Sequence, residues 1–373
     1  MTNLSVKQQN RQSIFKFISD NEAASRQDIA YGLKLSLQTV ITNLDYLTEA
    51  GLISNSDTMK STGGRKAVTY CINGSAKMAI GLYLTEHHIN SVCVNLNGKV
   101  IYSKKYRINL QPDSSVYLAE IGKIVDEIRI VAGLSEENIL GVGIALPALL
   151  SADNEAVILG VSELFEGMTR RKISKYISYK TCLVHDSYAA IFAETWKSEQ
   201  EENAFYIGLN NHISGGIVIR GQIYTGSGNK SGEIGHLSLY PDSEKVCYCG
   251  KHGCFETACA MTNLTKYTNG DLDLFFDLVA AGNSELLSVW EEYLDHLAHA
   301  ISIVRLLFDS TVIVGGYVGA RIGNYMNELC RRVDNYGFFD EKSVNFLKQC
   351  KYTVEDVAAG AALMYIDEFI NNI

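Results

Sequence analysis

After about residue 76 the sequence alternates between short β-rich runs and long helical segments, and this alternation restricts the fold most strongly. The β-rich runs include MAIGLYL, ILGVGIAL and AFYIGL, and the helical segments are VYLAEIGKIVDEIRIVAGL and SVWEEYLDHLAHAISIVRLLF. Such alternation is typical of α/β domains with mixed sheets. At 373 residues the chain is also too long for one ordinary core. We therefore expect an α/β body of more than one domain, with a boundary near residues 73–76.

The first 72 residues predict a separate helical unit. Ser25 can cap one helix, with Asp28 three residues later as an approximate capping box. Ser36 can cap the next helix, which stops at Gly51. Two helices joined by a connection of about four residues are the plan of a helix-turn-helix. The strands LIS and AVTYCIN, with a basic Gly-Gly turn between them, predict the winged form.

This N-terminal unit is the candidate DNA-binding part of the chain. Residues 1–70 contain eight Lys or Arg and six Asp or Glu, whereas the whole chain has a net charge of -9. A mildly basic end on an acidic body suggests different partners for the two parts. The alternative is a small helical cap with no role in DNA binding. The predicted DNA-binding residues, polar on the outer face of the third helix and basic at the wing tip, are Gln38, Thr39, Thr42, Asn43, Arg65 and Lys66.

A possible metal site lies in the stretch GEIGHLSLYPDSEKVCYCGKHGCFE, residues 232–256. One imidazole and three thiolates suit the tetrahedral preference of zinc, and the predicted ligands are His236, Cys247, Cys249 and Cys254. A full shell of four ligands leaves no open position, which indicates a structural and not a hydrolytic zinc ion. The alternative is a set of free thiols in an ordinary loop.

The cysteine content and the apolar runs bear on the compartment. Nine cysteines are an odd number, and a close cluster of them favours metal over disulfides in a reducing environment. The N-terminus shows no apolar run of a signal peptide, and no later segment reaches 18 uninterrupted apolar residues. We therefore expect a cytoplasmic protein without a membrane partner.

The metal motif resembles that of the ROK family, named for repressors, open reading frames and kinases. G-E-x-G-H followed by C-x-C-G-x-x-G-C-x-E is intact here, and GVGIALPALL, VHDSYAA, STVIVGGYV and VEDVAAGAAL are similar to other parts of the family. The resemblance implies an N-terminal winged helix-turn-helix on a two-lobed, actin-like sugar-kinase fold. The domains implied are 1–72 for DNA binding, 73–185 plus 355–373 for a smaller lobe, and 186–354 for a larger lobe with the zinc motif.

The resemblance also implies a sugar site. The positions that match the family's sugar-binding residues are Asp186, Glu233, His236 and Glu256. Carboxylates suit this task because each accepts several hydrogen bonds from hydroxyl groups. On this interpretation the zinc performs no reaction and shapes the floor of the pocket; the alternative is that these carboxylates form structural ion pairs. One departure is His185, which replaces the Asn that precedes the family's Asp.

The two phosphate-binding turns of the family's kinases are altered in this chain. Where the kinases have a D-x-G-G-T-like turn after the first strand, Tyr83 replaces the Asp and Thr85, Glu86 and His87 replace the Gly-Gly-Thr. The second turn, glycine-rich in the kinases, reads GLNNHISGG. A carboxylate in a phosphate-binding turn repels the nucleotide, so we expect no kinase activity.

Together these observations predict a sugar-responsive transcriptional regulator, a repressor by the resemblance, that is not an enzyme. Its expected partners are operator DNA, a sugar or sugar phosphate, and a second copy of the chain in a homodimer or larger homo-oligomer. Two alternatives stay open. One is a sugar kinase with an accessory N-terminal domain, and the other is a regulator controlled by a protein partner.

Overall fold

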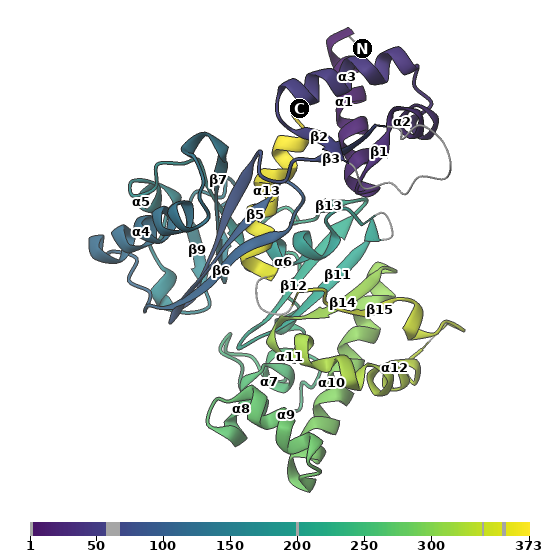
Figure 1. Cartoon of the computed structure of the whole chain (residues 1–373). Helices are drawn as coiled ribbons and strands as arrows, with labels where there is room; N and C mark the ends of the chain where they lie inside the picture. Colours follow the sequence, from purple (N-terminus) through teal and green to yellow (C-terminus); the bar gives the residue numbers. More distant parts are fainter. Residues whose placement is uncertain (1–2, 57–67, 199–200, 338, 353–355) are drawn as a thin grey trace. The chain divides into compact units, whose positions relative to one another are not determined.

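The computed structural model describes residues 3–56, 68–198, 201–337, 339–352 and 356–373. Its contacts divide the chain into two compact units. The first comprises Met1–Ile144, Thr169–Cys182 and Ala361–Ile373, and the second comprises Ala145–Met168 and Leu183–Gly360. Figure 1 colours both along the sequence. The three-domain division expected from the sequence stays a prediction.

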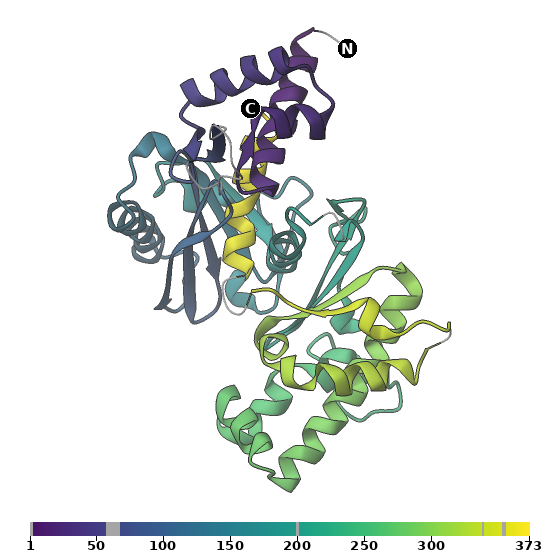
Figure 2. The ribbon, with the colours of Figure 1, turned by 45° about the vertical axis from the view of Figure 1, so that its right-hand side comes forward.

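The N-terminal part of the first unit is a three-helix bundle with a small sheet. Its elements are α1 (Asn3–Asp20), β1 (Ala24–Ser25), α2 (Arg26–Leu33), α3 (Leu37–Glu49), β2 (Ile53–Ser56) and β3 (Thr69–Ile72). The three strands pair antiparallel in the order β1-β3-β2. Figures 1 and 2 show the three helices gathered together, and fully buried apolar side chains such as Ile18, Ile29 and Leu44 fill the space between them.

Caps predicted from the sequence set the ends of these helices. Ser25 Oγ accepts a hydrogen bond from the Asp28 amide at 3.2 Å, and Asp28 Oδ2 accepts one from the Ser25 amide at 3.0 Å. This reciprocal pair is a capping box at the start of α2. Ser36 Oγ caps α3 by accepting from the Thr39 amide at 3.1 Å. Lys34, in the left-handed conformation at φ 53°, makes the turn between the two helices.

The rest of the first unit contains a five-stranded sheet in the order β10-β7-β4-β5-β6. Antiparallel pairing joins β4 to β5 and β5 to β6. Strands β7 and β10 begin in this unit and end in the second. The elements are β4 (Met78–Leu84), β5 (His88–Asn95), β6 (Val100–Arg107), α4 (Ser115–Val131), η1 (Glu136–Asn138), β7 (Ile139–Leu146), α5 (Arg170–Ser174), β10 (Thr181–His185) and the C-terminal helix α13 (Asp356–Ile370).

The second unit has its own five-stranded sheet, in the order β13-β12-β11-β14-β15. Strand β11 pairs antiparallel with β12 and parallel with β14. The strands are β8 (Ala148–Leu150), β9 (Val157–Gly160), β11 (Ala204–Leu209), β12 (Ile213–Ile219), β13 (Gln222–Ile223), β14 (Thr311–Gly315) and β15 (Leu347–Gln349). The helices are η2 (Glu163–Phe165), α6 (Asp186–Thr195), η4 (Ile234–His236), α7 (Phe255–Cys259), α8 (Thr262–Thr265), η5 (Lys266–Thr268), α9 (Leu272–Ala280), α10 (Ser284–Phe308), α11 (Gly316–Arg321), η6 (Ile322–Tyr325), α12 (Met326–Asp334) and η7 (Ser343–Asn345).

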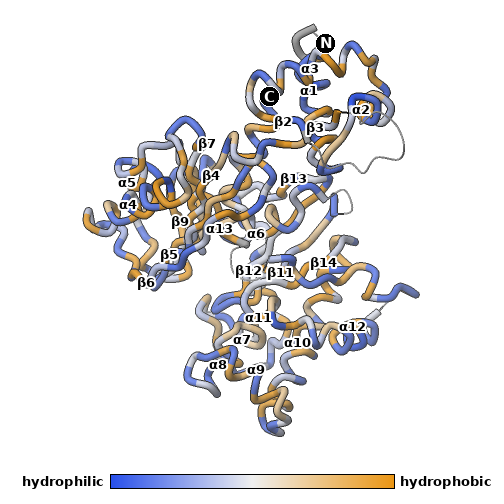
Figure 3. Tube along the Cα trace, in the orientation of Figure 1, coloured by the Kyte–Doolittle hydropathy of each residue, from blue (hydrophilic) through white to orange (hydrophobic). Residues whose placement is uncertain are grey.

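The hydrophobic core of the second unit extends to the segment that contains the predicted metal ligands. Helix α10 buries Trp290, Leu297 and Ile301 in this core, and Figure 3 shows hydrophobic and hydrophilic stretches alternating along it. Phe255, which immediately follows the last cysteine of the metal motif, is fully buried in the same core. The metal motif therefore rests on a packed base.

The fold class predicted from the sequence is confirmed: an N-terminal helix-turn-helix unit precedes an α/β body. The runs MAIGLYL, ILGVGIAL and AFYIGL coincide with β4, β7 and β11. The wing tip, including Arg65 and Lys66, lies outside the described residues. Among the residues that are described, no helix combines the length and apolarity needed to cross a bilayer.

Candidate functional site

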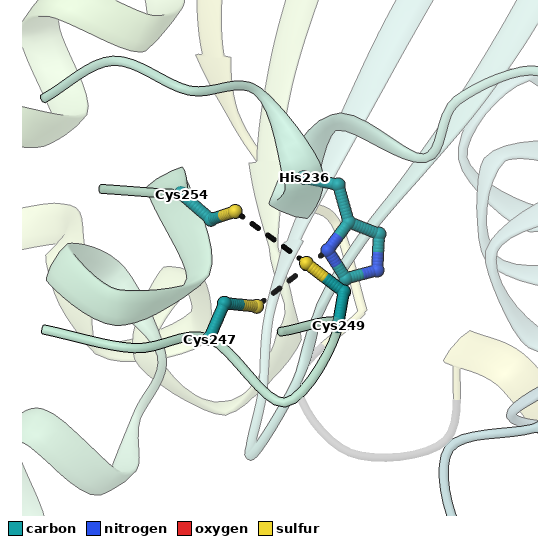
Figure 4. Close-up of side chains that lie close together, drawn as sticks. All are labelled: His236, Cys247, Cys249 and Cys254. Carbon is teal, nitrogen blue, oxygen red and sulfur yellow. Dashed lines mark hydrogen bonds between the residues drawn. The ribbon is translucent and has the colours of Figure 1, made fainter. Parts of the chain in front are cut away.

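The four predicted metal ligands come together in the second unit. His236 ends the 3-10 helix η4, Cys247 and Cys249 lie in the loop that follows, and Cys254 immediately precedes α7. Their ligand atoms all lie within 4.8 Å of one another. His236 Nδ1 is 3.6 Å from Cys247 Sγ, and Cys249 Sγ is 3.7 Å from Cys254 Sγ. One ring nitrogen of His236 faces the sulfurs and the other points away from them (Figure 4).

Two glycines in the motif allow the loop to bring the cysteines together. Gly250 and Gly253 have φ values of +82° and +64°. Residues with a Cβ adopt such values only at a cost in conformational energy. Gly253 also packs tightly, because an added Cβ would lie 1.6 Å from the carbonyl oxygen of Tyr240. Val246 and His252 form an isolated β-bridge across the loop.

The donor set of this cluster fits a tetrahedral metal ion. Cys247 and Cys254 are buried, Cys249 is exposed and His236 is half-buried. Burial raises the pKa of Cys247 to about 12, and a bound cation would supply the positive charge that stabilises thiolates there. One imidazole and three thiolates are a donor set typical of zinc, and together they fill a tetrahedral shell.

The four predicted sugar-binding residues also lie in the second unit, around this cluster. Asp186 begins α6 and is buried, whereas Glu233 immediately precedes η4. His185 lies between their side chains, with Nδ1 3.1 Å from Asp186 Oδ1 and Nε2 3.6 Å from Glu233 Oε1. The residue that departs from the family pattern therefore links two of the predicted site residues.

The acidic side chains of this cluster influence one another's protonation. Burial raises the pKa of Glu233; the charge of His185 opposes this shift, and the neighbouring carboxylates of Asp186 and Glu256 reinforce it. A raised pKa means that Glu233 gives up its proton less readily than an exposed glutamate. The cluster thus concentrates negative charge that hydroxyl donors or a cation can compensate.

Both carboxylate oxygens of Glu256 have partners within the chain. His212 Nδ1 lies 2.8 Å from Oε1, and the Ile213 amide donates to Oε2 at 2.7 Å. Glu256 is buried, and the contacts fix its direction. His212 belongs to the GLNNHISGG stretch, and the sequence did not predict that this residue of the β11–β12 turn would lie beside Glu256.

Tyr248 is a second residue that sequence reasoning missed. Its hydroxyl lies 3.1 Å from His236 Nε2, on the imidazole nitrogen that points away from the sulfurs. The Tyr248 ring also meets the rings of His236 and His212 edge-on, with centroids 5.0 Å and 5.1 Å apart. The only sequence signal was the position of a large aromatic residue between two cysteine ligands.

A side chain in each of the two altered turns accepts a hydrogen bond from a backbone amide. In the first unit, Thr85 Oγ1 accepts a hydrogen bond from the His88 amide at 3.1 Å, which tightens the turn between β4 and β5. In the second unit, Asn210 Oδ1 accepts from the Tyr317 amide at 3.0 Å. An amide of the first turn of α11 is therefore already bonded to protein.

On the N-terminal unit, most of the predicted DNA-binding residues of α3 face solvent. Gln38 and Thr42 are exposed and Thr39 is half-buried. The prediction that Asn43 points outward is wrong: its side chain is 7% exposed, and Nδ2 donates to the Thr39 carbonyl at 2.8 Å. Because the Asn43 side chain is hydrogen-bonded to the backbone of its own helix, it does not extend into solvent.

Known proteins resemble the chain over most of its length. It is 24% identical to a putative xylose repressor of Caldicellulosiruptor sp. (strain Rt8B.4), over 86% of this chain and 81% of that protein. It is 27% identical to the DNA-binding transcriptional dual regulator NagC of Escherichia coli (strain K12), over 68% of this chain and 63% of that protein.

Solved structures share the fold. A ROK family transcriptional regulator described as a homologue of the E. coli MLC protein matches with a TM-score of 0.74 and 21% identity, covering 98% of this chain and 97% of that one. A ROK family glucokinase from Streptomyces griseus, in complex with glucose and AMPPNP, matches with a TM-score of 0.66 and 18% identity, covering 77% and 98%. The ROK family model matches residues 79–368, more than half of the sequence, and the chain therefore belongs to the ROK family.

Proposed function

We propose that this protein is a sugar-responsive, DNA-binding transcriptional regulator whose kinase-like body senses the effector and does not phosphorylate it. The observation that carries the proposal is the capped helix pair α2–α3, which precedes an α/β body that contains an acidic, histidine-rich cluster. The similarity to proteins named as repressors and as a transcriptional regulator supports it.

On the DNA side, we propose that α3 reads bases in the major groove through Gln38, Thr39 and Thr42. Arg65 and Lys66 of the wing would contact the phosphate backbone or the minor groove, and a dimer would bind two half-sites about one helical turn, or a multiple, apart. The test is affinity for DNA selected from a random-sequence library. Gln38→Ala should weaken binding by about 1–3 kcal/mol and relax one base position. Equal affinity for selected and random DNA would exclude this function.

We propose that the metal is a structural zinc ion held by His236, Cys247, Cys249 and Cys254. The donor set and the closed shell support this assignment. Bound zinc would hold His236 and, through Cys254, the start of α7, so that Glu256 two residues later projects from a fixed base. Elemental analysis should give one zinc per chain, and a value well below one would contradict the assignment.

We propose that the protein has no sugar kinase activity. Glu86 places a carboxylate in the first altered turn. At the second, the Tyr317 amide already donates a hydrogen bond to the Asn210 side chain and so is not available to a phosphate. A coupled assay of ATP hydrolysis with a broad panel of sugars tests the proposal. Sugar-dependent turnover on the order of 1 per second, at the low end for ordinary enzymes, would favour the kinase alternative.

We propose that the effector is a sugar or sugar phosphate, bound by Asp186, Glu233, His236 and Glu256. A melting-temperature screen should include xylose, glucose and N-acetylglucosamine, with the 6-phosphates of the last two. A ligand changes DNA affinity only when it binds one conformation of the protein more tightly than another. If no sugar raises the melting temperature or alters operator affinity, the remaining alternative is control by a protein partner.

A contact within the first unit offers a route by which the body can influence DNA binding. Lys16 of α1 donates to the side-chain oxygen of Asn371 at 3.1 Å, and Gln12 donates to the Asn371 carbonyl. Asn371 directly follows α13, a helix that begins in the second unit. A change in the body that moves α13 would therefore reach the DNA-binding helices without passing through the linker at residues 73–76.

A further inference from the structure

Among the proposed sugar-binding residues, His236 and Glu256 each have a ring side chain of this protein beside an atom that can bond a sugar hydroxyl. If His236 bound a metal ion through Nδ1, the nitrogen that faces Cys247, Nε2 would remain for hydrogen bonding. The Tyr248 hydroxyl lies 3.1 Å from Nε2. His212 lies 2.8 Å from Glu256 Oε1. The Tyr248 ring contacts both histidine rings edge-on and therefore connects His236 to His212.

The environment of Tyr248 places it within the site and not merely near it. Its hydroxyl contacts the imidazole of His236, and its ring contacts the imidazole of His212, which in turn lies 2.8 Å from Glu256 Oε1. A phenol hydroxyl can donate or accept a hydrogen bond, as a sugar hydroxyl does. An aromatic hydroxyl on an imidazole nitrogen thus reproduces the chemical contact expected of the effector.

Tyr248 also has room to leave this position. The residue is 53% exposed, and it borders a cavity of about 580 Å³ whose other lining residues include Asn211, Lys245, Thr257 and Asn263. Rotation about the side-chain bonds of an exposed tyrosine takes place rapidly between staggered rotamers. Leaving His236 would break one hydrogen bond and the edge-on ring contacts.

We propose that Tyr248, together with His212, is an internal gate of the effector site. In the ligand-free protein the Tyr248 hydroxyl is hydrogen-bonded to His236 Nε2, and a sugar displaces it on binding. This inference rests on the proposed sugar site. The gate lowers the apparent affinity for the sugar, because only the fraction of molecules with Tyr248 displaced can bind it. It also selects for sugars whose hydroxyl groups can replace the phenol on His236.

The size of the effect follows from the contact that is lost. A hydrogen bond between neutral groups contributes a net stabilisation that corresponds to a factor of about 2 to 12 in an equilibrium constant. Tyr248→Phe removes the hydroxyl and keeps the ring, so it should lower the dissociation constant of the sugar by about this factor. Tyr248→Ala removes the ring contacts too and should lower it at least as much.

The experiment measures sugar binding by isothermal titration calorimetry in the full-length, zinc-containing protein. The probes are xylose, glucose, N-acetylglucosamine and the 6-phosphates of the last two. Tyr267→Ala is the matched control, since Tyr267 is an exposed tyrosine in the same unit that does not line this cavity. Zinc content and melting temperature, compared among all variants, identify any loss of folding, and Tyr248→Phe keeps the test valid if Tyr248→Ala is unstable.

The outcomes separate the gate from the sugar site. Tighter binding in Tyr248→Phe and Tyr248→Ala, with Tyr267→Ala unchanged, supports the gate; binding that appears only in the two Tyr248 variants supports it most strongly. Unchanged or weaker binding in Tyr248→Phe, while Asp186→Asn abolishes binding in the unmodified background, overturns the gate and leaves the sugar site standing. Absence of binding in all variants overturns both.

Discussion

Replacing Gly253 by Ala probes the packing that holds the metal motif in shape. Gly253 adopts φ +64°, and an added Cβ would lie 1.6 Å from the carbonyl oxygen of Tyr240 and 2.2 Å from its carbonyl carbon. The obstacle is backbone, which cannot rotate out of the way as a flexible side chain can. The Gly253 carbonyl also accepts hydrogen bonds from the amides of Leu239 and Tyr240 at 2.9 Å and 3.1 Å, so a shift of this residue disturbs both.

A second glycine in the same motif isolates the effect of the clash. Gly250 has a similar φ of +82°, but nothing lies within 4 Å of an added Cβ. The left-handed conformation costs a residue with a Cβ about 1–2 kcal/mol, of which the reduced entropy of the unfolded chain recovers about 0.5–1 kcal/mol. Overpacking adds about 1–3 kcal/mol. Gly250→Ala should therefore cost about 0–1.5 kcal/mol, and Gly253→Ala about 1–3 kcal/mol more.

Urea denaturation followed by tryptophan fluorescence measures this difference. Both tryptophans of the chain, Trp196 and Trp290, lie in the second unit, so their emission reports on the unit that contains the motif. Each variant is compared with the unmodified protein in buffer of the same total zinc concentration, and the zinc content of each protein is measured. We expect the lower urea midpoint and the lower zinc content in Gly253→Ala. Equal losses of unfolding free energy in the two variants would refute the steric argument.

Three further predictions address the metal, the turn and the pH dependence of stability. Cys249→Ser should lower zinc content and melting temperature together, as elemental analysis and calorimetry will show; a normal melting temperature without zinc would contradict a structural role. Lys34→Gly should raise the free energy of unfolding of the N-terminal unit by up to about 1 kcal/mol, because Lys34 has φ 53° and glycine adopts this conformation without a Cβ penalty; circular dichroism in urea checks this, and a loss of stability would oppose it. Burial would raise the pKa of Glu201, but the ammonium groups of Lys348 and Lys351 outweigh it and the pKa is lowered overall. The stability that the Glu201 carboxylate contributes should thus be present above its unfolded pKa of about 4.3 and be lost as the pH falls through the folded value. The difference in unfolding free energy between Glu201→Gln and the unmodified protein should shrink on acidification, and a constant difference from pH 7 to pH 3 would exclude this ion-pair effect.

Features governed by local spacing could be predicted from the sequence. The capping box of Ser25 and Asp28 depends on residues three apart, and the structure forms it as expected. The end of α3 at Glu49 also follows from a local signal, since Gly51 two residues later has φ +69°. The meeting of Cys247, Cys249 and Cys254 was predictable because they lie within eight residues of one another, with two glycines between them that allow a tight loop.

Features that depend on packing between distant segments could not be predicted. Asn43 fits the outer face of α3 by helical spacing alone, yet its amide bonds the Thr39 carbonyl and its side chain is buried. The meeting of His212 with Glu256 joins residues 44 positions apart, through the fold of the β11–β12 turn against α7. The direction of Tyr248 depends on how the whole metal loop folds, and no local pattern specifies it.

The measurement that tests the central claim most directly is operator affinity with and without sugar, for the unmodified protein and for Asp186→Asn. The DNA is the sequence selected from the random library, and the sugar is the one that raises the melting temperature most. Sugar should change the affinity of the unmodified protein roughly 5- to 150-fold, which corresponds to a typical allosteric coupling of about 1–3 kcal/mol. Asp186→Asn should retain its fold, zinc and operator binding, because the substitution removes a charge at the pocket and touches neither the metal ligands nor α3, but it should no longer respond to the sugar. An operator affinity that no sugar alters, or an Asp186→Asn protein that responds normally, would contradict a regulator controlled through this site.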